Sequence, residues 1–155
     1  MMKKLLLPFL LLFSFAASAQ LNNSWIDYSK TYYKFRIATD NVYRISKATL
    51  DATGIAATTN ADNFQLWRNG VQVRLYTSVS GAPLGASDYI EFWGEKNDGK
   101  ADKPLYKKPE FQLADKYSLE TDTAAYFLTI NPAGGNLRFV TTANTAPSAA
   151  TPDAY

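Results

Sequence analysis

The 155-residue chain contains neither cysteine nor histidine. A serine–histidine–aspartate triad, a cysteine–histidine pair and the usual zinc sites need these residues, so the chain cannot form them by itself. Disulfides are excluded as well, and a folded domain must therefore be held together by packing. Aspartate, lysine and tyrosine remain as candidate catalytic residues, but none stands in a recognisable catalytic pattern. An enzyme that uses only carboxylates and tyrosine is the least favoured hypothesis.

The N-terminus has the three parts of a secretory signal. Lys3 and Lys4 precede an apolar run over residues 5–13, and small residues follow up to Ala19, where we predict cleavage. The run is shorter than the roughly 20 apolar residues that cross a bilayer, and Pro8 interrupts it, so a membrane span is the weaker interpretation. We expect an exported protein, in the periplasm, at the cell surface or outside the cell, with no transmembrane segment after cleavage.

The chain also lacks an excess of charge of either sign. Removing the first 19 residues leaves 136 and takes away two of the 16 basic side chains, so 14 basic groups face 14 acidic groups. A near-neutral chain lacks the excess of positive charge that nucleic-acid binding requires, and we predict no nucleic-acid partner. Four cations are expected on outer strand faces, where we interpret them as a solvated surface rather than a binding patch. They are Lys34, Arg36, Arg44 and Arg74.

Alternating residues predict a first hairpin near the N-terminus of the mature chain. Residues 32–38 alternate between apolar and polar side chains, as in a half-buried strand. Residues 42–45 are predicted to pair back on them through a three-residue loop with Asn41 in the left-handed conformation. This register places Ile37 opposite Tyr43 on the core side.

The dipeptide Asn69-Gly70 between two alternating runs is the strongest hairpin signal in the chain. Counting outward from the turn assigns one face to the core and leaves Trp67 among polar neighbours on the other. The predicted core-side pairs are Arg68 with Val71, Leu66 with Val73, and Phe64 with Leu75.

Two further elements, a short helix and a strand, are expected in the middle of the domain. Ser46 is typical of an N-cap and Gly54 of a C-terminal cap, which predicts one short helix over residues 47–53. Residues 89–93 predict a strand that ends at Gly94.

The C-terminal part predicts a last hairpin, with strands over residues 126–130 and 137–140. Together these elements predict a mostly β fold, an antiparallel β-sandwich-like domain with one short helix. We assign residues 1–19 to the signal peptide, residues 20–142 to the N-terminal β-domain and residues 143–155 to a linker, because that last segment is too polar to order itself.

Between Glu95 and Asp102 the chain is rich in oxygen donors, which calcium prefers in surface loops. The spacing does not match the helix-flanked calcium loop, because the glycine falls too early after Glu95 and no glutamate closes the segment. A plain turn of asparagine, aspartate and glycine is the favoured interpretation, and we predict no cofactor.

Trp67 and Trp93 are the candidate binding residues. Flat amphipathic rings on outward strand faces can stack on sugars. The favoured alternative is that both rings pack at a seam between two sheets or against the next domain, since single exposed aromatic residues are ordinary.

Five stretches follow one another in an order that resembles a known family. They are Asp-Asn-Val-Tyr-Arg-Ile (residues 40–45), a short helix ending at Gly54, Leu-Trp-Arg-Asn-Gly (66–70), Asp-Tyr-Ile-Glu-Phe-Trp-Gly (88–94) and Asp-Thr-Ala-Ala-Tyr-Phe-Leu-Thr (122–129). As an ordered set they resemble the N-terminal β-domain of gingipain-type proteins, secreted cysteine peptidases and sortase-like proteins linked to the type IX secretion system of Bacteroidetes. The resemblance covers about residues 23–139.

The resemblance implies a non-catalytic N-terminal domain, propeptide-like or docking, with a cysteine–histidine peptidase domain downstream. The chain would then be truncated within the linker near Tyr155, and no catalytic residue of the family can be carried over to it. The implied partners are the downstream peptidase domain of the same polypeptide and the secretion machinery. The alternative is a stand-alone carbohydrate- or surface-binding β-sandwich that uses Trp67 and Trp93.

Overall fold

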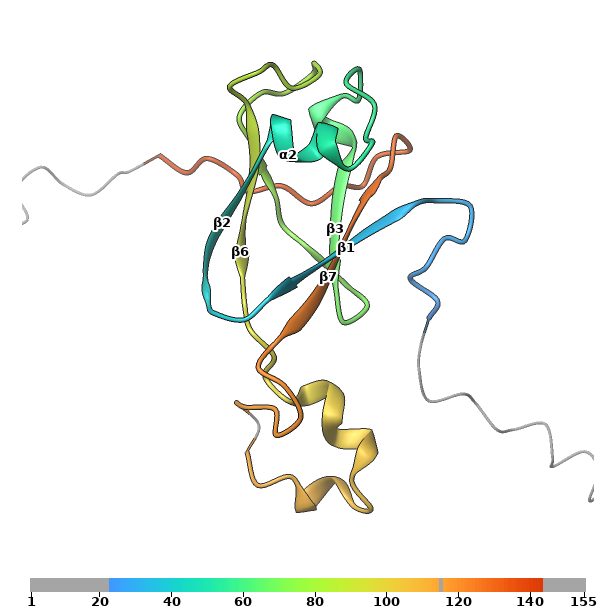
Figure 1. The fold of residues 1–155 in the computed structure, drawn as a ribbon, viewed down its shortest axis with the longest axis vertical. Coiled ribbons are helices and arrows are strands. Elements are labelled where there is room, and N and C mark those ends of the chain that lie inside the picture. Colours follow the sequence, from blue (N-terminus) through green and yellow to red (C-terminus); the bar gives the residue numbers. More distant parts are fainter. Residues whose placement is uncertain (1–22, 115, 144–155) are drawn as a thin grey trace, which may run out of the picture.

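Extended strands make up most of the regular structure in the computed structural model, which describes residues 23–114 and 116–143 (Figure 1). One sheet has four strands in the order β1 (Tyr32–Ile37), β7 (Ala124–Ile130), β3 (Phe64–Arg68) and β4 (Val71–Val73). The other has three, in the order β2 (Asn41–Ser46), β6 (Tyr89–Gly94) and β5 (Tyr76–Thr77). All strand pairs within the two sheets are antiparallel, so the predicted mostly β, sandwich-like fold is confirmed.

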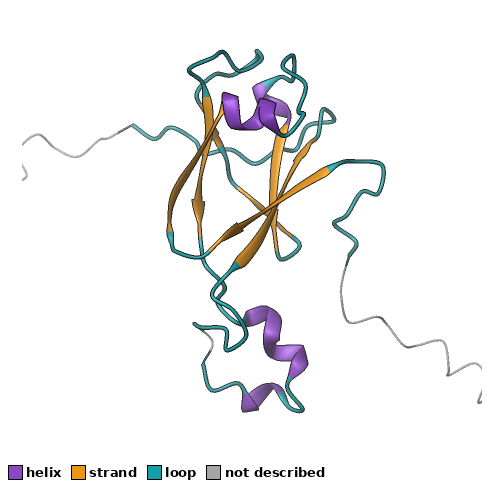
Figure 2. Cartoon of the chain, viewed as in Figure 1, coloured by secondary structure: helices purple, strands orange, loops and turns teal. Residues whose placement is uncertain are grey.

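The predicted short helix is also present, as α2 (Lys47–Ala52), and it ends one residue before the predicted end. Ser46 caps it, because its hydroxyl oxygen accepts the Thr49 backbone N–H at 3.2 Å. Gly54 follows the helix with a φ of +85°, the left-handed conformation that suits glycine there. Three short 3₁₀ helices were not predicted; they are η1 (Ala61–Asn63), η2 (Lys100–Leu105) and η3 (Pro109–Phe111) (Figure 2).

Aromatic rings from both sheets meet in the core. The rings of Phe92, Phe35 and Tyr126 all contact one another, with centroids 5.6–5.8 Å apart, and Phe35 and Tyr126 belong to the opposite sheet from Phe92. Tyr43 stacks on Phe92 at 5.9 Å. Alternate residues of each strand face this core, as the sequence period predicts. The largest fully buried side chains include Tyr126, Phe64, Phe92, Leu66, Leu75 and Ile90.

The Asn69-Gly70 hairpin between β3 and β4 is confirmed. Both turn residues have positive φ, +50° and +76°, as a two-residue turn of this kind requires. The register pairs Arg68 with Val71 and Leu66 with Val73. The predicted pairing of Phe64 with Leu75 is wrong: β4 ends at Val73, Phe64 lies opposite Ile130, and Leu75 pairs with residues 137–139 instead.

The predicted hairpin between residues 32–38 and 42–45 is wrong. β1 pairs with β7 and β2 pairs with β6, so Ile37 lies opposite Ala124 and Tyr43 lies opposite Phe92. Asn41 is not left-handed, since Asn69 is the only non-glycine residue with positive φ in the described ranges. Residues 38–40 carry the chain from one sheet to the other, and the two apolar faces meet across the core. A face-to-face arrangement and a hairpin require the same alternation, which is why the pattern did not distinguish them.

The predicted last hairpin is wrong as well. β7 has β1 on one edge and β3 on the other, which leaves no edge for residues 137–140. That segment runs parallel to Leu75, whose N–H donates to the Leu137 carbonyl at 3.2 Å. Arg138 holds it in place by donating through Nη2 to the carbonyls of Asp62 (2.8 Å) and Phe64 (2.9 Å).

Residues 95–123 connect β6 to β7 and extend beyond one end of the sandwich, opposite the end that carries α2 (Figure 1). We call them the excursion; η2 and η3 belong to it. Within the part of the chain that the structure describes, no helix has the length and apolarity needed to cross a membrane. The predicted signal peptide and residues 144–155 of the predicted linker lie outside the described residues.

Candidate functional site

A groove of about 920 Å³ surrounds the tip of the β3–β4 hairpin and reaches the first residues of the excursion. Its lining is predominantly apolar, and it draws on both sheets and on the segment that follows β7. Six of the lining residues are Trp25, Val71, Val73, Trp93, Ala101 and Phe139.

Three of these side chains leave a large apolar surface open to solvent. Trp93 is 48% exposed, because it alternates with the buried Phe92 and so points away from the core. Val71 is 67% exposed beside the hairpin turn. Phe139 is 49% exposed, and its N–H donates to the Leu75 carbonyl at 3.0 Å, which holds the segment against the sandwich. Apolar surface of this kind, rimmed by polar groups, is typical of an interaction site.

Arg68 lies where the groove meets the excursion. Its Nη1 donates to Glu95 Oε2 at 2.9 Å, and its Nη2 donates to the Lys96 carbonyl at 2.7 Å. A second carboxylate, that of Asp98, lies 3.8 Å from Nη2, and the Arg68 side chain is only 12% exposed. The guanidinium is therefore engaged in tying the hairpin to the excursion.

The titratable groups beside Arg68 are also committed to structural contacts. Partial burial raises the pKa of Asp98, but hydrogen bonds from Lys100 and the charge of Arg68 outweigh it and hold that pKa below its usual value. Burial raises the pKa of the Tyr126 phenol, whose oxygen accepts the Glu95 N–H at 2.8 Å. The Tyr126 phenol positions the backbone at Glu95, and the charges of Arg68, Asp98 and Lys100 neutralise one another. Such an arrangement suits binding better than proton transfer.

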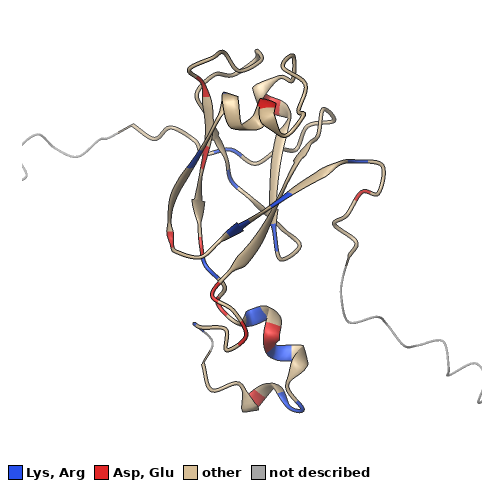
Figure 3. Cartoon of the chain, in the orientation of Figure 1, with Lys and Arg blue, Asp and Glu red and all other residues tan. Residues whose placement is uncertain are grey.

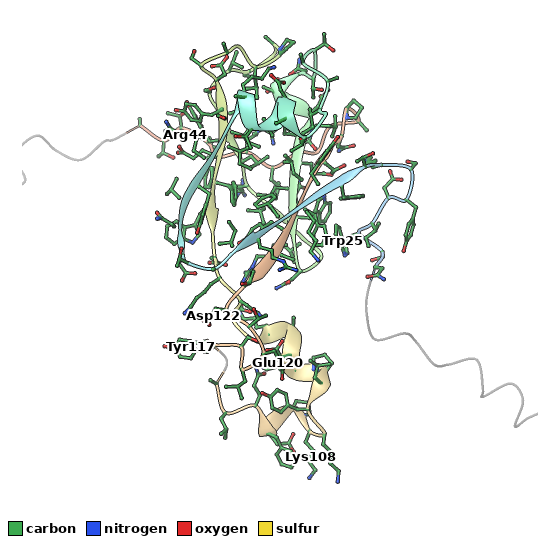
Figure 4. The ribbon with its side chains drawn as sticks, viewed as in Figure 1. Trp25, Arg44, Lys108, Tyr117, Glu120 and Asp122 are labelled. Carbon is green, nitrogen blue, oxygen red and sulfur yellow. The ribbon has the colours of Figure 1, made fainter. Side chains whose placement is uncertain are left out.

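Trp67 lies elsewhere, on the outer face of the four-stranded sheet. Its ring packs on Trp25 with centroids 5.5 Å apart, and its Nε1 donates to Gln65 Oε1 at 3.1 Å. The polar neighbour was expected, but the cover by Trp25 was not. Trp25 also packs against Phe127 (5.4 Å) and Tyr32 (5.6 Å), and Figure 4 shows it beside the sheet.

The two predicted site residues are therefore not brought together. Trp67 faces outward from one sheet and Trp93 from the other, so they cannot form one flat platform. Trp93 lines the groove, whereas Trp67 does not. Sequence reasoning missed Trp25, and its one available signal was a large aromatic residue next to Ile26 in a short segment that shows no strand alternation.

The segment predicted as a calcium loop or turn forms a turn closed by its own side chains. Gly99 has a φ of +76°, and its N–H donates to Asn97 Oδ1 at 3.1 Å. Asp102 is 8% exposed and accepts a hydrogen bond from the Ser118 hydroxyl. Over residues 23–114 and 116–143, no cluster of three or more acidic side chains is arranged to hold a metal ion.

Three of the four cations expected on outer strand faces lie there, but on different sheets, whereas Arg74 lies between β4 and β5 and belongs to no strand. Figure 3 shows lysines and arginines spread over the molecule. Lys34 and Arg36 belong to the outer face of β1. Arg44 belongs to β2, where it pairs with Glu91 at 2.8 Å. Arg74 donates to the Arg138 carbonyl at 2.9 Å. They do not gather into one basic patch.

Three of the stretches that resemble the gingipain-type family meet at the groove. They contribute the hairpin residues 68–70, Trp93 at the end of β6, and residues 125–127 of β7. Comparisons of the chain with family models, with curated proteins and with solved structures find no match.

Proposed function

We propose that this chain is the non-catalytic N-terminal docking domain of an exported gingipain-type protein, and that the groove receives a surface of the peptidase domain. The observation that carries the proposal is the exposed apolar lining of the groove, formed by Trp93, Val71 and Phe139. Of these three residues, Trp93 belongs to a stretch on which the family resemblance rests.

The chemistry of the groove favours a protein partner. Aromatic anchors in a concave site supply most of the free energy of binding in protein interfaces. Four of the charged groups that line the groove already neutralise one another, Arg68 with Glu95 and Lys100 with Asp98. Arg74 also lines it and has no acidic partner among the described residues, so we expect the docked surface to place an acceptor or a carboxylate there.

The position of the groove also suits a partner in the same polypeptide. Val140 and the residues up to Ala143 are exposed and follow directly after Phe139, so the chain leaves the sandwich beside the groove. A domain tethered there would bind at a high effective concentration. The type IX secretion machinery remains a second predicted partner.

Photo-crosslinking tests the proposal in the protein as its host exports it. Trp93 is replaced by p-benzoylphenylalanine, and the crosslinked peptides are identified by mass spectrometry after irradiation. We expect crosslinks to a peptidase-type domain. The matched control is the same replacement at Tyr76, which lies on the same sheet with a similar exposure of 45% but outside the groove lining.

Crosslinks that come from position 93 and not from position 76 support docking in the groove. Equal yields from the two positions, or no protein crosslink from position 93, contradict it.

A second candidate function, carbohydrate binding, rests on the outer face of the three-stranded sheet. Trp93 and Tyr76 are exposed there, and the Arg44 guanidinium lies 3.7 Å from the centroid of the Tyr89 ring. Stacked sugars would perturb the indole of Trp93. Tryptophan fluorescence titrated with surface polysaccharides tests this candidate. A change lost in Trp93→Ala but kept in Trp67→Phe supports it, and the absence of any change contradicts it.

A further inference from the structure

Three large apolar side chains at the far end of the excursion are more than half exposed. Leu105 is 75%, Phe111 52% and Leu113 94% exposed. They lie within eleven consecutive residues, 103–113, which we call the tip. Scattered exposed leucines need no explanation, but a cluster on one short projecting segment indicates a surface that is covered when the protein works.

Unpaired cations accompany these side chains. Lys103, Lys107 and Lys108 are exposed, and none of them forms an ion pair with any described residue. Lys108 lies 5.6 Å from the centroid of the Phe111 ring. Arg44 and Lys47 of the sandwich are paired with Glu91 and Asp51, whereas Lys34 and Arg36 on β1 form no ion pair with any described residue but have no exposed leucine beside them in the strand. The tip also carries one exposed carboxylate, Glu110, so its three lysines leave an excess of positive charge beside the exposed apolar groups.

The tip is held out from the body rather than folded onto it. Figure 4 shows Lys108 at the extremity of the excursion, away from the sandwich. The base of the excursion is fixed by the Asp102–Ser118 hydrogen bond and by Gln112 Nε2, which donates to the Gly99 carbonyl at 2.7 Å. Pro104 and Pro109 restrict the backbone within the tip.

We propose that the tip binds the interface of an anionic lipid bilayer. Leu105, Phe111 and Leu113 would enter the boundary between headgroups and acyl chains, while the lysines lie along the surface with their ammonium groups on lipid phosphates. A convex projection with flanking lysines matches a deformable anionic surface. A protein partner would instead need a cavity complementary to it.

The proposal is independent of the proposed function, because Pro104 is the one tip residue in the described lining of the groove, and neither the inserting side chains nor the lysines of the tip line it. Vesicle co-sedimentation of the exported chain tests it, with phosphatidylcholine vesicles that contain or lack phosphatidylglycerol. We expect binding to the anionic vesicles that falls as salt is added, and little binding to the neutral ones.

Two tip variants sharpen the test. We expect Leu105→Ser with Leu113→Ser to weaken binding strongly, because of the three inserting side chains only Phe111 remains beside the electrostatic attraction. Lys107→Gln with Lys108→Gln should weaken partitioning about 25-fold, or about fivefold for each lysine. The matched controls outside the tip are Val42→Ser, at a 55% exposed position, and Lys34→Gln with Arg36→Gln. Tryptophan fluorescence checks folding, since Trp25, Trp67 and Trp93 all lie outside the tip.

Binding weakened in the tip variants and kept in the controls supports the proposal. It is overturned by a failure of the wild-type chain to bind anionic vesicles, or by equal binding of wild type and lysine variant. The wild type could instead fail to bind vesicles and form a dimer in solution that the leucine variant does not form. That result would show that a second copy covers the tip, and it would also overturn the proposal. The lysine variant alters only exposed charge, so the test does not depend on the leucine variant folding.

Discussion

The sandwich and the excursion differ in which side chains they bury. In the sandwich, rings such as Phe92 and Tyr126 pack on one another and are almost fully buried. In the described part of the excursion the buried side chains are polar, Asp102 and Ser118, while leucines and Phe111 face solvent. The sandwich therefore holds itself together by apolar burial, whereas the excursion depends on a few hydrogen bonds.

The difference indicates that the sandwich supplies the stability of the domain, whereas the excursion supplies a surface for binding. Regions with little buried apolar surface open at low free-energy cost, and binding segments are commonly drawn from them. The excursion can expose apolar groups because the sandwich folds without them. Arg68 and Tyr126 join the two regions through Glu95 and Lys96.

The largest effect should come from opening the core of the sandwich. We expect Phe92→Ala to lower the free energy of unfolding by about 3–5 kcal/mol, because it leaves a cavity among Phe35, Tyr43 and Tyr126. Phe111→Ala, in the excursion, should change it by less than about 0.5 kcal/mol. Urea denaturation measures the free energy of unfolding of both variants. Similar decreases for Phe92→Ala and Phe111→Ala would contradict the difference in burial between the two regions.

Breaking the connection at Arg68 should have the next largest effect. Arg68→Met removes charge-assisted hydrogen bonds to Glu95 and Lys96, which we expect to cost about 1.5–3 kcal/mol. Hydrogen exchange should rise mainly in the excursion, because the ring contacts in the core are untouched. Arg68→Lys, which keeps the charge but not the forked geometry, is the matched control. Uniform exchange across both regions would contradict a local connection.

A smaller, local effect is expected at Gly99. Its φ is +76°, and an added Cβ would lie 2.5 Å from the Tyr117 carbonyl oxygen, so Gly99→Ala must distort the excursion. A left-handed alanine costs about 1–2 kcal/mol, and we expect faster proteolysis within residues 95–123 with little change in the melting temperature of the sandwich. Gly81→Ala is the control, because it shares a positive φ but meets no neighbouring atom within 4 Å. Comparable protease resistance in both variants would count against the crowding argument.

The smallest effect should appear in acid. The pKa of Asp98 is held low in the folded protein, so its contribution to stability is present above the unfolded value and is lost as the pH falls through the folded value. We expect the excursion to exchange amide hydrogens faster at pH below about 4, before the sandwich unfolds. Asp98→Asn should remove this pH-dependent step. If the pH-dependent step persists in Asp98→Asn, another carboxylate causes it.

Local signals predicted the local elements well. The Asn69-Gly70 turn, the Ser46 cap and the strand over residues 89–93 each depend on a few neighbouring residues, and the structure contains all three. Of the candidate site, Trp93 was predicted because its alternation with Phe92 points it outward. Trp25 was missed because its partners Trp67 and Phe127 lie far along the chain.

Alternation along the chain determined that this protein is mostly β and which side of most strands is apolar, while local signals determined its tight turn, at Asn69-Gly70, and its short helix, capped by Ser46. Tertiary structure alone decided that β1 pairs with β7 and β2 with β6, that Phe139 reaches Leu75, and that the groove forms around the hairpin tip. The physical reason is that a two-residue period marks one face of a strand as apolar without specifying which other apolar face will cover it. That choice belongs to the packing of the whole domain, in which long-range burial outweighs the proximity of neighbouring strands.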